Sequence, residues 1–268
     1  MSVFTEFLTE TLVEGRPLGR HVQHDPASRR YALDTSGLSL TSVRHERYAP
    51  ILDQGNVGCC TGCAMTGALS CDPFWETAPA GHPTYDITEA LKLYSEATQL
   101  DSITGAYPPD DTGSTGLAVA QAAQRDGLIS GYLHTFTLND ALLALSTTPI
   151  LIGISWFSSF DTPDANGLVS IAPGANVRGG HELVVDEVVV AGSSITIGFD
   201  NSWGASWGDA GRGYMSADTF GTLLNLRGDV VVPVPITAPT PVPAPAPNAD
   251  DLNLWVQMKA WAKAKGLV

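Results

Sequence analysis

The stretch DQGNVGCCTGC at residues 53–63 decides the fold, because it joins a glycine-containing loop to an apolar, small-residue segment. The spacing of the apolar residues predicts a helix over 58–69. A thiol in the first turn of a helix lies near unpaired backbone N–H groups, whose partial positive charge favours the thiolate. Cys60 is therefore a candidate nucleophile. The side-chain amide of Gln54 can reach the same point as the Cys60 backbone N–H, which gives two donors for an oxyanion.

Two later segments carry the remaining candidate catalytic residues: GGHELVV at 179–185 and DNSWGASWGDAGRGYM at 200–215. An imidazole can hold a proton and pass it to a leaving amine, while an asparagine amide fixes which ring nitrogen faces the sulfur. His181 and Asn201 are the candidates for these two roles. They follow Cys60 by 121 and 141 residues, respectively.

Together the three segments resemble the papain-like cysteine peptidases. The matching residues are Gln54, Gly55, Gly58 and Cys60, then His181, then Asn201, Ser202, Trp203, Gly204, Trp207 and Gly208. The resemblance covers residues 43–220 and implies an α+β, two-lobe fold with a helical left lobe, an antiparallel β right lobe and a cleft between them. It also implies hydrolysis of peptide bonds in a peptide or protein substrate by a thiolate–imidazolium pair, with no cofactor and no metal.

The resemblance further implies substrate contacts at Gly113 and Ser114, which occupy the place of a glycine-rich edge that pairs with substrate backbone. Trp203 is placed with them and would also shield the His–Asn pair from water. Val57 stands where many family members carry a disulfide cysteine, which points to a disulfide-free bacterial or phage-like branch. Glu182 replaces a small residue; because neighbours on a strand face opposite sides, a role outside the cleft is expected for it.

Three alternatives remain open at this point. Cys60 and Cys63 form a CxxC pair, which is also typical of redox proteins, and the four cysteines Cys59, Cys60, Cys63 and Cys71 could be considered as zinc ligands. Cys59 adjoins Cys60, so either sulfur could react, although the spacing from Gln54 favours Cys60. The third alternative is a catalytically silent papain-like scaffold that serves as a structural or binding module of a virion or another assembly.

Helices precede strands along the chain. Amphipathic patterns predict helices over 87–100 and 115–126, and from Pro149 onward the β-branched runs PILIGISWF, HELVVDEVVV, SITIGFDNSW and RGYMSA predict strands. Helices followed by a set of antiparallel strands are typical of an α+β protein. The sequence thus predicts the same fold class as the resemblance.

Composition limits the partners. The 28 acidic and 14 basic residues give a net charge of −14, which argues against nucleic acid as a ligand. Residues 141–160 are uncharged, but Pro149 divides them into a helical and a strand-like half, so no membrane span is expected. Acidic residues near the N-terminus are unlike a signal peptide. We therefore expect a cytoplasmic location in a bacterium or a phage-infected cell, or a virion-associated one.

Four segments are predicted along the chain. Residues 1–42 form an extended arm or a short pro-segment, and 43–232 form the peptidase domain. Residues 233–248 alternate proline with small residues and predict a stiff linker. Residues 249–268 predict a helix with Trp255 and Trp261 on one face. This helix would dock on a second copy of the chain or on a larger assembly, with packing back on its own domain as the alternative.

Overall fold

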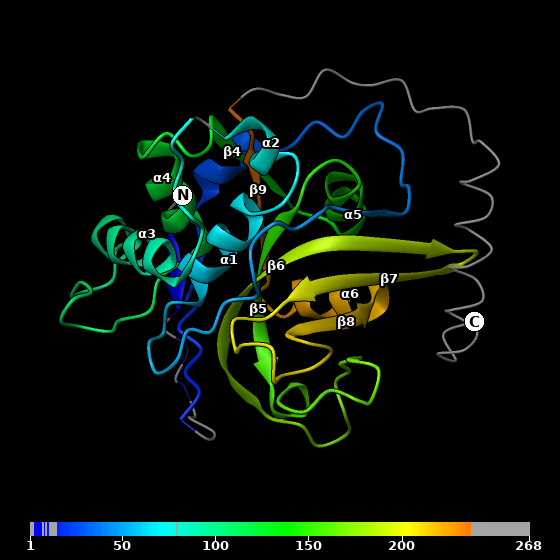
Figure 1. The fold of residues 1–268 in the computed structure, drawn as a ribbon. Helices are drawn as coiled ribbons and strands as arrows, with labels where there is room; N and C mark the ends of the chain where they lie inside the picture. Colours follow the sequence, from blue (N-terminus) through cyan, green and yellow to red (C-terminus); the bar gives the residue numbers. More distant parts are fainter. Residues whose placement is uncertain (1–2, 7, 9, 11–14, 79, 237–268) are drawn as a thin grey trace. The chain divides into compact units, whose positions relative to one another are not determined.

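The computed structural model describes residues 3–236, apart from 7, 9, 11–14 and 79 (Figure 1). Its helices are α1 (Cys60–Leu69), α2 (Phe74–Thr77), α3 (Ile87–Leu100), α4 (Gly116–Arg125), α5 (Leu138–Leu145) and α6 (Ala217–Asn225), with 3-10 turns η1 (Pro26–Tyr31) and η2 (Ser158–Phe160). Its strands are β1 (Phe4–Glu6), β2 (Val22–His24), β3 (Val43–Arg44), β4 (Gly131–Thr135), β5 (Ile150–Phe157), β6 (Val177–Ala191), β7 (Ser194–Asp200), β8 (Arg212–Ser216) and β9 (Asp229–Val234). Most of the predicted linker and the whole predicted C-terminal helix lie outside the described residues.

A seven-stranded antiparallel sheet organises the described chain. Its strand order is β4-β9-β5-β6-β7-β8, and β3 adds to β6, while β1 and β2 form a separate pair. The core on one face of the sheet joins Leu151, Val184 and Val231 to residues of α1, α3 and α4. The core on the other face joins Ile152, Leu183 and Val185 to residues of α5 and α6. The predicted α+β fold class is confirmed.

Helix α1 lies between α3 and strand β6 (Figure 1) and is buried along its whole length. Two glycines permit this position. A Cβ at Gly62 would overlap the carbonyl oxygen of Ala90 on α3, and a Cβ at Gly67 would lie 2.8 Å from a methyl group of Val184 on β6. The small residues of α1 therefore let its backbone approach both neighbours, which brings the start of the helix to the middle of β6.

The uncharged stretch 141–160 divides as predicted: α5 ends at Leu145 and β5 begins at Ile150. Within the described residues, no helix has the length and apolar character needed to cross a membrane. Strands β4 and β9 were not predicted. Pro233, assigned to the linker from sequence, is instead a residue of β9 opposite Tyr132 of β4. Strand β5 pairs with β9 only over residues 229–231, so the missing N–H of Pro233 breaks no bond on that side.

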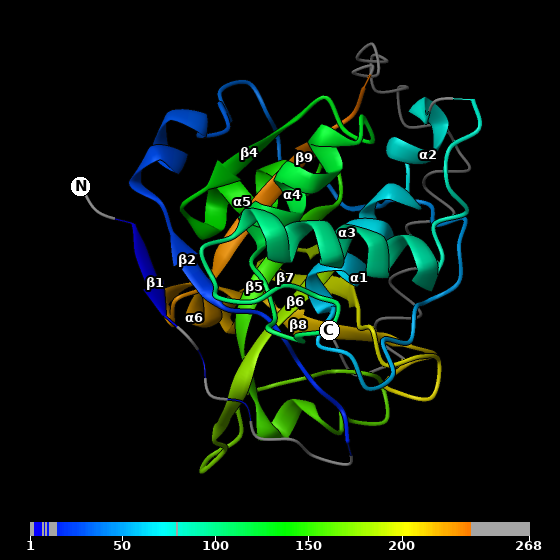
Figure 2. The ribbon, with the colours of Figure 1, turned by 90° about the vertical axis from the view of Figure 1, so that its left-hand side faces the viewer.

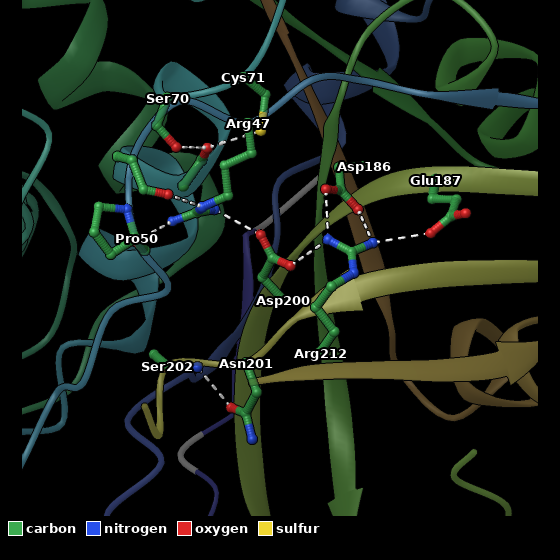
Figure 3. A network of polar contacts seen from close by, with 12 residues as sticks. Arg47, Pro50, Ser70, Cys71, Asp186, Glu187, Asp200, Asn201, Ser202 and Arg212 are labelled. Carbon is green, nitrogen blue, oxygen red and sulfur yellow. Dashed lines mark hydrogen bonds and ion pairs between the residues drawn. The ribbon is translucent and has the colours of Figure 1, made fainter. Parts of the chain in front are cut away.

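A buried ionic network holds β6, β7 and β8 together (Figure 3). Arg212 donates to Asp186 at 2.7 and 2.8 Å, to Asp200 at 2.6 Å and to Glu187 at 3.0 Å. Arg47, in the loop before α1, donates to the other oxygen of Asp200 at 2.6 Å. The network thus joins three strands to the segment that leads into α1. Its member Asp200 directly precedes the candidate site residue Asn201.

Replacing Arg212 with methionine would leave its carboxylate partners buried without their shared cation. We expect Arg212→Met to lower the free energy of unfolding by about 3–5 kcal/mol in urea titrations. The matched control is Lys92→Met, because the Lys92 side chain is 48% exposed while paired with Glu89 and Asp126. Its loss should cost less than about 1 kcal/mol. Equal losses of unfolding free energy in both variants would show that the buried Arg212 network contributes no more to stability than an exposed ion pair.

Candidate active site

Cys60 is the first residue of α1 and is fully buried. Its sulfur accepts a hydrogen bond from the backbone N–H of Glu182, at 3.4 Å, so it lies against the residue that follows His181. The structure thus brings Cys60 against a residue 122 positions later in the sequence. The position of Cys60 at the helix start agrees with the sequence prediction.

His181 and Asn201 form a hydrogen-bonded pair. The distance from His181 Nε2 to Asn201 Oδ1 is 2.8 Å, and the same oxygen accepts from the Ser202 backbone N–H at 2.8 Å. Among the described residues, His181 Nδ1 has no hydrogen-bond partner, although the residue is fully buried. The rings of Trp156 and Trp203 lie 4.8 and 5.5 Å from the His181 ring and keep water from the pair. This arrangement leaves one imidazole nitrogen free for proton transfer.

Gln54 lies close to the same loop. Its backbone N–H donates to the Ser202 carbonyl at 2.8 Å, and its side-chain oxygen accepts from the Ser202 hydroxyl at 2.5 Å. The side-chain nitrogen donates to the carbonyl of Val57 at 2.8 Å and also to those of Pro17 and Leu18, at 3.2 and 3.3 Å. The amide predicted to hold an oxyanion is therefore occupied by peptide carbonyls of the N-terminal segment.

This segment runs through the site (Figure 2, dark blue). The backbone N–H of Arg20 donates to the Gly180 carbonyl at 3.0 Å. On the other side, Ser114 N–H donates to Gly19 and His21 N–H donates to Ser114, both at 2.8 Å, which makes a parallel β-bridge between Arg20 and Ser114. We call residues 16–21 the covering segment. It lies on the edge, at Gly113 and Ser114, that the sequence assigned to substrate.

Side chains of the covering segment complete the closure. Leu18 is fully buried, and its N–H donates to the Glu10 carboxylate at 2.5 Å. The guanidinium of Arg16 lies 5.4 Å from the centre of the Trp203 ring. Trp203 itself is only 4% exposed and packs on His181. In this conformation Trp203 contacts the covering segment as well as the imidazole.

Burial changes the protonation of the site. It raises the pKa of the Cys60 thiol well above its usual range, and the hydrogen bond from Glu182 offsets only part of the shift. Burial also lowers the pKa of His181 to about 4, against the opposing effect of the bond to Asn201. At neutral pH the covered site therefore holds a thiol and a neutral imidazole. The thiolate–imidazolium pair expected from the sequence does not describe this closed state.

The other cysteines behave differently from the alternatives drawn from sequence. Cys63 faces Cys59, with 3.8 Å between the sulfurs, and Cys71 contacts the Gly67 carbonyl. The facing thiols are thus separated by four residues and are not the CxxC pair. No group of three or more His, Cys, Asp or Glu residues in the described part of the chain is arranged as metal ligands.

The position of Glu182 agrees only in part with the expectation. It does face the opposite side of β6 from His181, but the covering segment reaches that side, where the Arg20 side chain forms an ion pair with Asp229. Glu182 is 1% exposed, and its carboxylate lies beside this pair. Glu182 thus faces away from His181, as expected, but it is buried beside the covering segment. Sequence reasoning missed Arg20 and Asp229 altogether, because their proximity depends on strand register and on the path of the covering segment.

No family model matches this chain, and no curated protein sequence is similar to it. Similar solved structures exist. Xylellain, a cysteine protease from Xylella fastidiosa, matches with a TM-score of 0.64 at 15% identity, over 85% of this chain and all of that one. Digestive procathepsin L 3 of Tenebrio molitor larval midgut matches with a TM-score of 0.58 at 13% identity, over 85% of this chain and 83% of that one. The Amb a 11 cysteine protease of ragweed pollen, in its proform, matches with a TM-score of 0.51 at 13% identity, over 76% and 70% of the two chains.

These likenesses define the class of fold: the chain has the papain-like fold of cysteine proteases, as the sequence predicted. Identities of 13–15% show the fold alone, so the activity has to be argued from the site itself.

Gly19 offers a way to loosen the covering segment in the full chain. It has φ +105°, and a Cβ there would overlap the Gly58 carbonyl. Because a non-glycine residue in such a conformation costs about 1–3 kcal/mol, we expect Gly19→Ala to raise the rate of Cys60 alkylation by iodoacetamide about tenfold or more.

The matched control is Gly37→Ala, since Gly37 has φ +84° and open space around its Cα. This variant carries a similar backbone strain away from the site. Peptide mapping by mass spectrometry gives the modified cysteine and its rate. Equal acceleration in the two variants, or first modification of Cys59, would contradict the assignment of the covered nucleophile.

Proposed function

We propose that the protein is a papain-like cysteine endopeptidase in which Cys60, His181, Asn201 and Gln54 carry the reaction. The observation that supports this most is the His181–Asn201 hydrogen bond beside a thiol at the start of α1. The contact of the Gln54 amide with peptide carbonyls adds to it, because a peptide already lies where a substrate carbonyl would have to bind.

In the proposed reaction, His181 Nδ1 takes the thiol proton, and the Cys60 sulfur attacks the carbonyl carbon of the substrate. The Gln54 amide and the Cys60 backbone N–H hold the oxygen of the tetrahedral intermediate. The imidazolium then gives its proton to the leaving amine, which leaves a thioester on Cys60. A water molecule, deprotonated by His181, hydrolyses the thioester and frees the thiol. Asn201 keeps the ring in the orientation that serves both transfers.

We also propose that the covering segment is an inhibitory pro-segment that must leave the cleft before turnover. It fills the substrate edge at Gly113 and Ser114 and occupies the Gln54 amide. Two of the similar structures are described as a procathepsin and as a proform. Whether the segment is cleaved off or only displaced, its departure would let water reach Cys60 and His181, which removes the cause of their shifted pKa values.

A silent scaffold accounts less well for the site. The buried His181 Nδ1 and Asn201 Nδ2 have no hydrogen-bond partner among the described residues. Such groups cost stability, and a role in a reaction would explain why they are present. Docking through the predicted C-terminal helix, oligomer formation, and a cytoplasmic or virion-associated location remain predictions from the sequence.

Substitutions at the four residues separate their roles in peptide hydrolysis. We expect Cys60→Ala and His181→Ala to lower kcat/KM on a fluorogenic peptide by at least about a thousandfold. Gln54→Ala should lower kcat by about a hundredfold or more, because one oxyanion donor is lost. Asn201→Ala should leave a weakened enzyme, since this residue orients the base and transfers no proton.

The control is Cys71→Ala, which removes a thiol that lies away from His181. A peptidyl epoxide should label Cys60 in the wild type and in Cys71→Ala, and mass spectrometry reports the site. Full turnover in His181→Ala would exclude the mechanism. Absence of labelling and turnover even in Gly19→Ala would favour the scaffold.

A further inference from the structure

A pocket beside the nucleophile is formed by three adjacent strands and lined by two acidic side chains. Gly153 on β5 pairs with Glu182 on β6 and with Asp229 on β9. The three residues therefore form one row across the sheet, with their side-chain positions on the same face. The middle residue has no side chain, so the row is a space with a carboxyl group at each end.

The size of this space can be judged from the positions that a Cβ atom would take at two glycines. A Cβ at Gly153 would lie 2.6 Å from Asp229 Oδ1 and 2.9 Å from Glu182 Oε2. A Cβ at Gly116, the first residue of α4, would lie 2.6 Å from Glu182 Oε1 and 3.3 Å from Asp229 Oδ2. A Cβ at either position would meet these carboxyl oxygens, so the two glycines leave a space between Glu182 and Asp229, which the Arg20 side chain fills in the covered state.

The covering segment places a cation in this pocket. The Arg20 side chain is fully buried; its Nη2 forms an ion pair with Asp229 and donates to the Arg227 carbonyl at 3.0 Å. Its Nε lies 2.5 Å from the position that a Gly153 Cβ would take, a position also close to both acids. Both Glu182 oxygens lack a hydrogen-bond partner among the described residues, so the pocket has acceptors that Arg20 does not use.

The charge balance favours a basic occupant. Burial raises the pKa of Glu182, the neighbouring Asp229 raises it further, and only Arg20 acts in the opposite direction. An apolar occupant would leave two buried carboxyl groups without a partner, which is costly. A guanidinium or ammonium group can supply donors to such carboxyl groups. Arg20 gives its Nη2 to Asp229, while its Nε and Nη1, like both Glu182 oxygens, have no hydrogen-bond partner among the described residues.

The pocket lies close to the reacting atoms. The backbone N–H of Glu182 contacts the Cys60 sulfur, and Leu18, whose carbonyl reaches Gln54, is two residues from Arg20. A side chain in the pocket would thus belong to a residue within two positions of the peptide bond that the thiol attacks.

We propose, building on the proposed peptidase function, that Glu182 and Asp229 select substrates with arginine or lysine at one fixed position beside the cleaved bond. Arg20 occupies the pocket in the covered state and anchors the covering segment there. The pocket thereby recognises the same chemical group in the segment and in the substrate.

The test uses the full chain and fluorogenic peptides in which each of the four residues before the cleaved bond is in turn arginine, citrulline, lysine or norleucine. Citrulline and norleucine keep the size and remove the charge. At one position, we expect kcat/KM for arginine to exceed that for citrulline by about a hundredfold or more, because the uncharged analogue leaves buried acids unpaired. Glu182→Gln and Asp229→Asn should each reduce this ratio about tenfold.

Glu76→Gln, which changes an exposed carboxylate on α2, should leave the ratio unchanged. Thermal unfolding checks each variant; if Asp229→Asn does not fold, Glu182→Gln decides. Cleavage without a basic preference at any position, or a preference that both variants retain, would overturn the proposed specificity while leaving the peptidase function intact. No cleavage of any peptide together with no epoxide labelling of Cys60 would overturn the function itself.

A second measurement does not depend on turnover. Arg20→Met removes the anchor, so Cys60 should be labelled by a peptidyl epoxide about tenfold faster than in the wild type. The control Arg125→Met removes an exposed guanidinium in the last turn of α4. Equal labelling rates in the wild type and Arg20→Met would show that the pocket does not hold the segment.

Discussion

Close contact between α1 and β6 is the constraint on which the candidate site depends. The thiol of Cys60 reaches the backbone of Glu182 only because glycines of α1 allow the helix to touch α3 on one side and Val184 on the other. A helix of ordinary bulk would stand farther from the sheet by the depth of a side chain. In the covered state the thiol placed in this way is also fully buried.

That burial explains the electrostatic state of the covered molecule. The low pKa of His181, about 4, and the raised pKa of Cys60 both arise chiefly from desolvation, with no strong opposite charge to compensate. A helix N-terminus contributes at most a partial charge, which is too little to hold a fully buried thiolate. In the proposed mechanism, activation of the thiol is coupled to the opening of the cleft, so the covering segment would control chemistry as well as access.

The sequence was informative where the decisive residues are close together or belong to recognisable motifs. The helix at 60–69, the break at Pro149 and the pairing of His181 with Asn201 all follow from local patterns or from the resemblance. The row of Asp229, Gly153 and Glu182 could not be predicted, because it depends on the register of three strands that are distant in the sequence. Alternation along β6 gave the correct face for Glu182, but the sequence did not reveal that the covering segment passes over that face. Strand β9 was hidden by its proline, which is tolerated where β5 no longer pairs with it.

Buried polar groups explain why the cleft needs an occupant. Besides its bond to Val57 in its own loop, the Gln54 amide donates to the covering segment; the edge at Ser114 needs a paired backbone, and the two acids need a cation. Water or a substrate can satisfy these groups in an open cleft, whereas the covering segment satisfies them in the closed one. Each contact that would recognise substrate therefore also stabilises the covered state. A change that tightens the binding of substrate would also tighten the binding of the covering segment, which competes with substrate for the same groups. Some contacts of the covering segment have no counterpart in a substrate, such as the stacking of Arg16 on Trp203 and the bond from Leu18 to Glu10. Weakening these contacts would favour release of the segment without weakening the binding of substrate. These contacts lie outside the pocket and the edge, so they can set the stability of the covered state independently of the selectivity of the cleft.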